Sequence, residues 1–252
     1  VLNYGSQTII PKEFESLVKN RNAFSIKPFL RAYDSILKED IFDSVNELPF
    51  VIVGSGLAAI EVSYALRKRW GDRPLKLLCD SRKINNTILK SLRNSNIDLV
   101  EKLNFDYGKI LLCTGNTSPL WAQKKLLDSD SYGRIITNQN LQIKSFSGIF
   151  AVGDCAVVGS AKRPASGVFA VKVVNTLVQN LKKDIEGRSL KKWFPQKIGL
   201  QIVNIFPSHH PKAFAIYRNF VFGPSFIFWI LKHKIDLNFI KKFRSKRLIM
   251  KS

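Results

Sequence analysis

Cysteine is scarce in this chain, and its three copies are far apart. Cys79, Cys113 and Cys155 form no C-x-x-C pair, which excludes a zinc ribbon and a dithiol redox relay. Each lies in an apolar, strand-like stretch, where a thiol packs as a small hydrophobic side chain. We therefore expect three inert core thiols, and we predict no metal site.

Methionine and acidic residues are also few. Met250 is the only methionine and the chain begins at Val1, so we expect a fragment or a processed chain. No signal-peptide pattern is visible, although a missing N-terminus would hide one. Against 19 Asp and Glu stand 40 Lys and Arg, which gives a net charge of +21. Such a charge could steer the chain toward nucleic acid or an anionic membrane, or it could reflect a Lys-rich composition.

The stretch from Phe50 to Glu61 is the most informative part of the chain. An apolar strand runs into Gly54, and a helical pattern follows from Leu57 to Arg69. In the pattern G-x-G-x-x-A, the first glycine allows a sharp turn and the second lets backbone approach a pyrophosphate. The alanine lets the helix pack close to the strand. Because N–H groups at the helix start attract phosphates, we predict a dinucleotide-binding turn.

A second predicted strand, Leu75–Asp80, ends in a carboxylate 26 residues after Gly54. Near this offset an acidic residue hydrogen-bonds the adenosine ribose of NADH. Arg82 and Lys83 follow directly and could instead hold the extra phosphate of NADPH. We prefer NADH, and an ordinary turn residue is the alternative for Asp80.

Two further buried strands end in glycine motifs. Lys109–Cys113 leads to Gly115, and Ile149–Val152 delivers Gly153-Asp154 to its carboxyl end, where open α/β sheets bind ligands. A carboxylate there can accept hydrogen bonds from a sugar or sugar-alcohol chain. Other expected elements are helices at 26–37, 85–94 and 168–181, strands at 97–103 and 132–137, and an acidic connector at 38–48.

The C-terminal residues 195–252 are rich in aromatics and cations, with ten Lys and Arg against one acid in 212–252. The apolar stretch 219–231 is too short to span a bilayer. Aromatics beside a cationic helix suit an interfacial membrane anchor, and a core-packing strand-and-helix module is the alternative. Nucleic acid is a third option, but no recognisable motif supports it, and we do not expect it as a partner.

Short segments in the right order resemble the two-dinucleotide-fold flavoprotein reductases, and among them the type II NADH dehydrogenase group. Members related to the reductase half of selenide, water dikinase fusions are the most similar. The segments are Asn3-Tyr-Gly-Ser6 (first hinge, A-T-G-S), Ile26-Lys-Pro-Phe-Leu-Arg31 (V-K-P segment), Gly54–Glu61 (G-G-G-x-A-G-x-E), Cys113-Thr-Gly115 (second hinge), Ile149–Asp154 (V-F-A-x-G-D) and Arg163–Ala170 (R-P-x-A-G-V-F-A).

The resemblance implies an α/β fold with a Rossmann-like NAD(P)-binding domain inserted in an incomplete FAD-binding domain, and a C-terminal α+β module. The expected boundaries are 1–47 for the first FAD-domain segment and linker and 48–117 for the NAD(P)-binding domain. Residues 118–194 would be the returning FAD-domain segment, and 195–252 the basic, aromatic module.

The resemblance also implies roles for single residues. NAD(P) would contact Gly54, Ser55, Gly56, Leu57, Ala58, Ala59, Glu61, Asp80, Arg82, Thr114 and Gly115. FAD would contact Gly5, Gly153, Asp154, Pro164, Val168, Phe169 and Ala170. Asp154 would bind the ribityl chain with Gly153 giving clearance, and the helix start in 163–170 would lie near the pyrimidine end of the flavin. Glu61 would lie near nicotinamide and flavin as the catalytic candidate; a carboxylate favoured by the helix dipole is the alternative.

Three departures from the family pattern matter. The first FAD motif, a G-x-G-x-x-G, is absent, so we expect a fused or associated N-terminal FAD half; otherwise the chain is flavin-free. Only 35 residues separate Asp80 from Gly115, which leaves little room for the usual β-meander. Quinone-reducing relatives carry a Gln in the flavin-side helix, where this chain has Val171–Asn175, so quinone as acceptor is unproven.

We therefore predict an FAD-dependent NAD(P)H dehydrogenase that transfers hydride from NADH to FAD and passes electrons to quinone or a similar small acceptor. It would be cytoplasmic, or at the cytoplasmic face of a membrane that residues 212–252 contact peripherally. One alternative is a soluble reductase whose cationic C-terminus docks a protein electron carrier. The other is a non-catalytic nucleotide-binding remnant.

Overall fold

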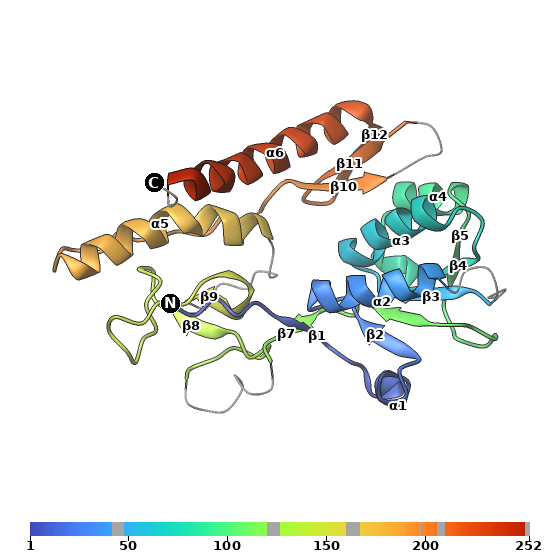
Figure 1. The fold of residues 1–252 in the computed structure, drawn as a ribbon, viewed down its shortest axis with the longest axis horizontal. Helices are drawn as coiled ribbons and strands as arrows, with labels where there is room; N and C mark the ends of the chain where they lie inside the picture. The colour runs from blue at the N-terminus through green and yellow to red at the C-terminus, as the bar shows by residue number, and fades with distance from the viewer. Residues whose placement is uncertain (42–47, 120–126, 160–166, 197, 206–209, 250–252) are drawn as a thin grey trace. The chain divides into compact units, whose positions relative to one another are not determined.

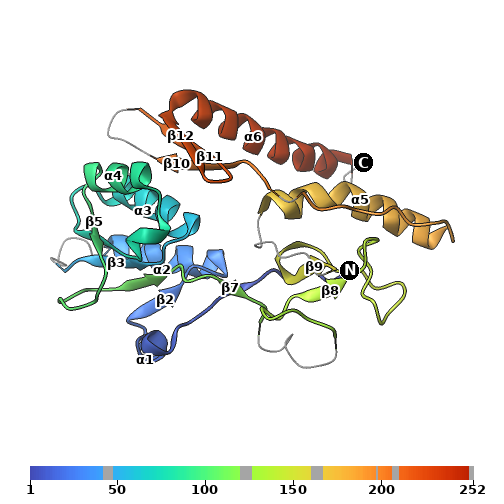
Figure 2. The same cartoon turned by 180° about the vertical axis from the view of Figure 1, so that it is seen from behind.

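The computed structural model describes residues 1–41, 48–119, 127–159, 167–196, 198–205 and 210–249 (Figures 1 and 2). The chain divides into two compact units, each made of segments that are separate in sequence. The first unit is Val1–Glu39 with Thr114–Gly199, and the second is Asp40–Cys113 with Leu200–Ser252. The domain boundaries expected from the sequence stay a prediction.

The second unit is built on parallel strands that lie side by side in the order β6, β3, β4, β5. They are β3 (Phe50–Val53), β4 (Leu75–Leu78), β5 (Ile97–Val100) and β6 (Ile110–Leu112). Helices α3 (Leu57–Trp70) and α4 (Asn86–Asn94) connect β3 to β4 and β4 to β5. The Tyr64 hydroxyl donates to Ser91 Oγ at 2.7 Å, which joins the two helices on one face of the sheet. The parallel sheet confirms the predicted α/β fold class.

The same unit contains an antiparallel meander of β10 (Gln201–Ile205), β11 (Lys212–Tyr217) and β12 (Phe220–Ser225). Helix α6 (Phe226–Ile249) packs along β11, and α3 packs against β10. The apolar stretch 219–231 therefore becomes the last strand and the first turns of α6. None of the helices that the structure describes could cross a membrane.

The first unit is less regular. It holds two small sheets, an antiparallel pair of β1 (Gln7–Thr8) with β7 (Asn116–Thr117) and a parallel pair of β8 (Ile135–Thr137) with β9 (Ala156–Val158). Its other elements are η1 (Lys12–Phe14), α1 (Glu15–Lys19), β2 (Ala23–Ser25), most of α2 (Phe29–Ile41), η4 (Gly153–Cys155) and α5 (Gly167–Ile185). Helix α5 packs against η4, which brings the predicted Gly153-Asp154 motif to the start of that helix.

The three cysteines lie in the cores of the two units. All are free thiols, and Cys155, fully buried, packs with Ile135, Ile143 and Ala151. Burial raises the pKa of the Cys113 thiol to about 12 and also raises the pKa of Cys79 and Cys155. A buried thiol with a raised pKa is a poor nucleophile. The expectation of three buried core thiols is confirmed.

Helix α2 corrects the predicted connector at 38–48. The helix runs on to Ile41, so residues 38–41 are helical, while 42–47 lie outside the described residues. Asp40 explains the extension, because its carboxylate accepts Arg69 Nε at 2.7 Å and Trp70 Nε1 at 2.6 Å from α3. The Arg69 hydrogen bond lowers the pKa of Asp40, which favours the paired, ionised form. A tertiary ion pair, which the local sequence does not reveal, holds the last described turn of this helix against α3.

Other predicted elements also differ in extent. The helix expected at 168–181 continues through Lys182 and Lys183 to Ile185, because lysine is a good helix former; the chain leaves the helix near Gly187, which has φ +66°. In the strand expected at Ile149–Val152, the last three residues are buried but Ile149 is 38% exposed. The segment pairs only through isolated bridges, such as the parallel bridge of Ala151 with Leu2. Its neighbours run beside it too briefly to form a ladder.

Gly54 lies at the turn from β3 into α3, where neighbouring backbone and the helix leave little space for a side chain. Its φ is +143°, and its N–H donates to the Leu78 carbonyl at 2.9 Å. A Cβ on Gly54 would lie 2.5 Å from the Cys113 carbonyl oxygen and 3.3 Å from the Ala59 Cβ. Backbone on one side and a helix on the other leave room for hydrogen alone. At Gly56, by contrast, a Cβ would meet nothing within 4 Å.

We expect Gly54→Ala to lower the free energy of unfolding by at least about 1–3 kcal/mol, because it adds backbone strain and a clash. Gly56→Ala is the matched control and should cost less than about 1 kcal/mol, as an N-cap change in open space. Urea unfolding of the two variants measures both values. Equal stability of Gly54→Ala and wild type would contradict the close approach described above.

Candidate functional site

The glycine turn forms the centre of the candidate site in the second unit. Gly56 is the N-cap of α3 with extended backbone (φ −86°, ψ 167°), and no side chain caps the helix start. The N–H groups at the start of α3 are thus left for a ligand, and the space in front of Gly56 is open. A helix start of this kind attracts phosphate groups. The geometry fits the pyrophosphate of a dinucleotide.

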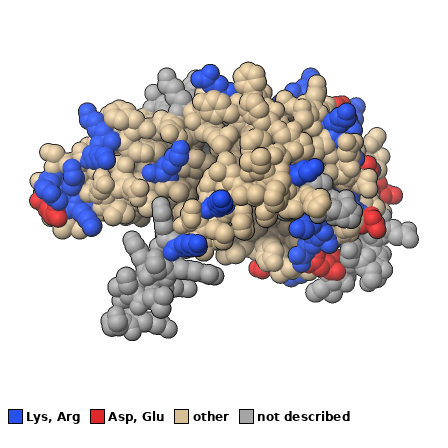
Figure 3. All heavy atoms as spheres, turned by 90° about the horizontal axis from the view of Figure 1, so that it is seen from above, with Lys and Arg blue, Asp and Glu red and all other residues tan. Residues whose placement is uncertain are grey.

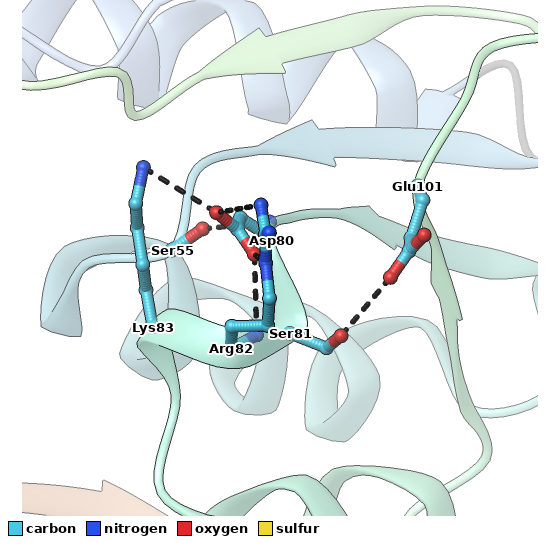
Figure 4. A network of polar contacts seen from close by, with 6 residues as sticks. All are labelled: Ser55, Asp80, Ser81, Arg82, Lys83 and Glu101. Carbon is cyan, nitrogen blue, oxygen red and sulfur yellow. Dashed lines mark hydrogen bonds and ion pairs between the residues drawn. The ribbon is translucent and has the colours of Figure 1, made fainter.

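Asp80 follows β4 at the same edge of the sheet, because Val53 and Leu78 are paired in register. Its N–H donates to Ser55 Oγ at 2.9 Å, which ties this turn to the glycine turn (Figure 4). Its carboxylate accepts Arg82 Nε at 2.9 Å and Arg82 Nη2 at 3.1 Å. The structure therefore brings the predicted residues Ser55, Asp80 and Arg82 together.

Glu61 lies in the second turn of α3 and has partners from the C-terminal module. The Lys232 ammonium of α6 donates to Glu61 Oε1, and the Asn204 N–H of β10 lies 3.4 Å from the same oxygen. The two ionic side chains are 37% and 22% exposed for Glu61 and Lys232, so solvent screens the pair only in part. The pair fixes the direction of the Glu61 carboxylate near the glycine turn. It also compensates the charge of that carboxylate.

Thr114 and Gly115, predicted to contact NAD(P), belong to the first unit. The Thr114 hydroxyl donates to the Ile9 carbonyl, and the Ile9 N–H donates to the Gly115 carbonyl at 3.2 Å. Gly115 has φ +99°, a conformation that favours glycine. These contacts join the second hinge segment, Cys113–Gly115, to Ile9, which lies three residues after the first hinge segment. The structure does not bring Thr114 and Gly115 into one unit with Gly54.

Asp154, the predicted ribityl ligand, lies in a polar cluster of the first unit. Its Oδ2 accepts the Lys27 ammonium at 2.7 Å and the Ser6 hydroxyl at 3.2 Å. Lys27 also donates to Ser6 Oγ at 2.9 Å, and Asn116 Nδ2 lies 3.3 Å from that oxygen. The Asp154 side chain is 21% exposed, and its Oδ1 has no partner among the described residues. An acceptor that is positioned and open on one side fits a sugar-alcohol chain.

The other predicted flavin contacts are placed around this cluster. Gly153 has φ +80°, a conformation that favours glycine, and a Cβ there would lie 2.5 Å from Asn3 Oδ1. Gly5 has φ +73° with open space around it. Phe169 is buried in the first turns of α5, and Val168 and Ala170 beside it are partly exposed. Pro164 lies outside the described residues.

Two lysines that sequence reasoning did not assign pair with predicted site residues: Lys27 with Asp154 in the first unit, and Lys232 with Glu61 in the second. Lys27 lies inside the Ile26–Arg31 segment that resembles a family motif, and that motif is the signal that could have marked it. Lys232 is one cation among many in the C-terminal residues, and no local pattern distinguishes it from Lys234. Within the described ranges, no three His, Cys, Asp or Glu side chains gather as a metal site requires.

Comparisons with known proteins bear on the family. No protein-family model matches the chain. The chain is 24% identical over 232 residues to ferroptosis suppressor protein 1 of Homo sapiens, covering 77% of this chain and 58% of that protein. It is 28% identical over 176 residues to a probable NADH dehydrogenase of Dictyostelium discoideum, covering 52% and 39%. The chain thus spans roughly half the length of these curated relatives.

Solved structures show the same fold. The sulfide:quinone oxidoreductase of Aquifex aeolicus superposes with a TM-score of 0.65 at 16% identity, covering 96% of this chain and 68% of that one. The water-forming NADH oxidase of Lactobacillus brevis, bound to NADH, superposes with a TM-score of 0.54 at 17% identity, covering 84% and 58%. In sequence motifs, fold and relatives alike, the chain is similar to the FAD- and NAD(P)-dependent pyridine nucleotide-disulfide oxidoreductases, and among them to the type II NADH dehydrogenases.

Proposed function

We propose that this chain is part of a flavin-dependent NAD(P)H dehydrogenase that passes electrons to quinone or a similar small acceptor. The observation that carries the proposal is the turn from β3 through Gly54 into α3, with the Asp80 turn tied to it by Ser55. Relatives described as a probable NADH dehydrogenase and a sulfide:quinone oxidoreductase support the reaction class and the kind of acceptor.

The chain's own residues would bind and orient the reactants. When bound, a flavin accepts hydride from NAD(P)H and releases electrons to an acceptor. Gly54–Ala59 would hold the pyrophosphate at the start of α3, where the helix dipole favours anions. Asp154, positioned by Lys27, would accept hydrogen bonds from the ribityl hydroxyls. Each of these roles is binding and orientation.

Glu61 would act at the nicotinamide end of the dinucleotide. It lies five residues after Gly56 on α3, and Lys232 holds its carboxylate in one direction. A carboxylate held in this way can orient an amide group by accepting its N–H. Lys232 is thus a positioning residue for Glu61.

Peripheral membrane contact through 212–252 is part of the proposal. Ile227, Leu231 and Ile235 are spaced by four on α6 and are 72%, 40% and 53% exposed. Phe220 and Phe222 of β12 are 65% and 51% exposed. When several large apolar side chains are exposed to solvent close together, they mark an interaction surface. Cations beside an apolar helix face favour an anionic lipid surface as the partner.

The distribution of charge on the surface agrees with an anionic membrane surface as the partner. Figure 3 shows Lys and Arg scattered over the face seen from above, among wide areas without charge. The excess of positive charge is therefore spread over this face. A scattered charge attracts an anionic surface generally but reads no sequence of bases.

The flavin part of the proposal is tested by adding FAD to the purified protein and recording the visible absorption of bound flavin. We expect bound flavin that NADH bleaches without oxygen and that a soluble quinone restores. Asp154→Ala should weaken FAD binding about tenfold or more, since the ribityl chain loses an ionised acceptor. Asp34→Ala, which removes an exposed carboxylate from α2, is the control.

Three outcomes would redirect the assignment. Full-length protein that stays colourless with FAD would establish a nucleotide-binding remnant. Bleached flavin that only a protein electron carrier reoxidises would establish a reductase of such a carrier. Equal FAD affinity of Asp154→Ala and Asp34→Ala would remove Asp154 from the flavin site.

Membrane contact is tested by co-sedimentation with vesicles of phosphatidylcholine, with and without phosphatidylglycerol. Burial of a Leu or Ile side chain contributes about 1.5–3 kcal/mol, so Ile227→Glu with Leu231→Glu should weaken binding about 100-fold or more. Ile185→Glu on α5, where the wild-type side chain is 87% exposed, is the matched apolar-to-acid control. Binding of the α6 double variant at wild-type strength would refute an anchor on α6.

A further inference from the structure

Ser6 lies at the centre of the polar cluster around Asp154 and uses all of its hydrogen-bonding positions. Its hydroxyl donates to Asp154 Oδ2 at 3.2 Å. Its Oγ accepts the Lys27 ammonium at 2.9 Å and Asn116 Nδ2 at 3.3 Å. Because a hydroxyl has one donor and two acceptor positions, Ser6 keeps none for a ligand. Ser6 therefore holds the cluster together, and a ligand must bind to its neighbours.

Lys27 and Asp154 keep one open donor and one open acceptor. An ammonium has three N–H donors, and Lys27 uses one on Asp154 and one on Ser6. Its third N–H and the Asp154 Oδ1 have no partner among the residues that the structure describes. The two side chains are 36% and 21% exposed, so a ligand can reach them from solvent. Because Lys27 Nζ and Asp154 Oδ2 are 2.7 Å apart, one small ligand can meet both open positions.

The Lys27 side chain is held at both of its ends. Its backbone N–H donates to Thr8 Oγ1 at 3.0 Å, and Thr8 is only 4% exposed. Thr8 belongs to β1, where it is paired in register with Asn116 of β7. At the other end, the ammonium is held by Asp154 and Ser6. A cation that is positioned before the ligand arrives loses little conformational freedom when the ligand binds.

The two open positions select a class of ligand. A phosphate or a carbonyl group offers acceptors alone and would satisfy Lys27 but not Asp154. An amine offers donors alone and would satisfy only Asp154. A hydroxyl both donates and accepts, so neighbouring hydroxyls of a polyol can donate to Asp154 Oδ1 and accept from Lys27. Both hydrogen bonds would involve an ionised group, which makes them stronger than neutral ones. The cluster therefore fits a vicinal diol.

Resting on the proposed function, we propose that Lys27 is itself a flavin ligand, whose third N–H donates to a ribityl hydroxyl oxygen while Asp154 Oδ1 accepts from a neighbouring hydroxyl. Lys27 then has two roles, because it positions Asp154 and also contacts the flavin directly. The pair recognises the polyol chain, and neither the flavin ring nor the adenine takes part in this contact. All residues of the cluster belong to the first unit.

Titration of FAD into flavin-free, full-length protein, followed by flavin fluorescence, tests the direct contact. Lys27→Met should weaken FAD binding about tenfold or more, as the loss of a hydrogen bond from a charged group does. Lys19→Met, which removes an exposed cation from α1 of the same unit, is the control and should bind FAD as wild type does. Lumiflavin, which has the flavin ring but no ribityl chain, should bind wild type and Lys27→Met equally.

The decisive comparison is made in an Asp154→Ala background, where the carboxylate that Lys27 positions is gone. Adding Lys27→Met to Asp154→Ala should weaken FAD binding by a further factor of about three or more, because the direct hydrogen bond is lost as well. This comparison stays valid if Lys27→Met alone is unstable, because the double variant leaves neither charge of the pair without its partner.

The outcomes separate this inference from the proposed function. Equal FAD affinity of Asp154→Ala and the double variant would show that Lys27 acts only through Asp154, which overturns the direct contact and leaves the proposed function in place. Full-length wild type that binds no flavin would overturn both. A loss in Lys19→Met as large as that in Lys27→Met would show a general attraction of cations for the FAD phosphates. That result, or an equal loss of lumiflavin binding in Lys27→Met, would overturn the ribityl contact.

Discussion

The contact of Gly54 with the backbone of Cys113 is the constraint on which the rest of the candidate site depends. β3 lies between β4 and β6, so the chain can turn into α3 at this edge only where no side chain occupies the space. The turn leaves the start of α3 without a side-chain cap and puts Ser55 within hydrogen-bond distance of Asp80. A single residue without a side chain therefore sets both the uncapped start of α3, where we propose that the phosphates bind, and the position of Ser55 beside Asp80.

The candidate carboxylates share one electrostatic arrangement. Lys27 holds Asp154, Lys232 holds Glu61, and Arg82 holds Asp80. Each carboxylate is partly shielded from solvent and has a cation beside it, which fixes its orientation and offsets the free energy of partial burial. Preorganised groups of this kind lose little freedom when a ligand binds. The chain has a net charge of +21, and some of its cations thus serve to orient the candidate carboxylates.

Local sequence patterns predicted much of the fold. They failed where contacts between residues far apart in the sequence determine the extent of an element or the partner of a charge. The helix after Gly54 and the strands around it follow from apolar runs and glycine punctuation, which act within a few residues. The length of α2 did not follow, because Asp40 is held by Arg69 from another helix. The site divides in the same way: Asp80 and Arg82 could be found as neighbours in sequence, whereas Lys232 is 171 residues from Glu61 and only folding joins them. Sequence motifs predict the course of the backbone at the glycine turn; they do not reveal which charges will be paired.

The claim that the turn after β3 binds the pyrophosphate is tested most directly by nuclear magnetic resonance of the backbone amides during titration with ADP-ribose, which lacks the nicotinamide ring. The account predicts the largest shifts at the Gly54–Ala59 amides, with smaller shifts at Asp80 and Arg82 and none at Asp154. Saturable binding with shifts confined to other residues, and none between Gly54 and Ala59, would contradict it.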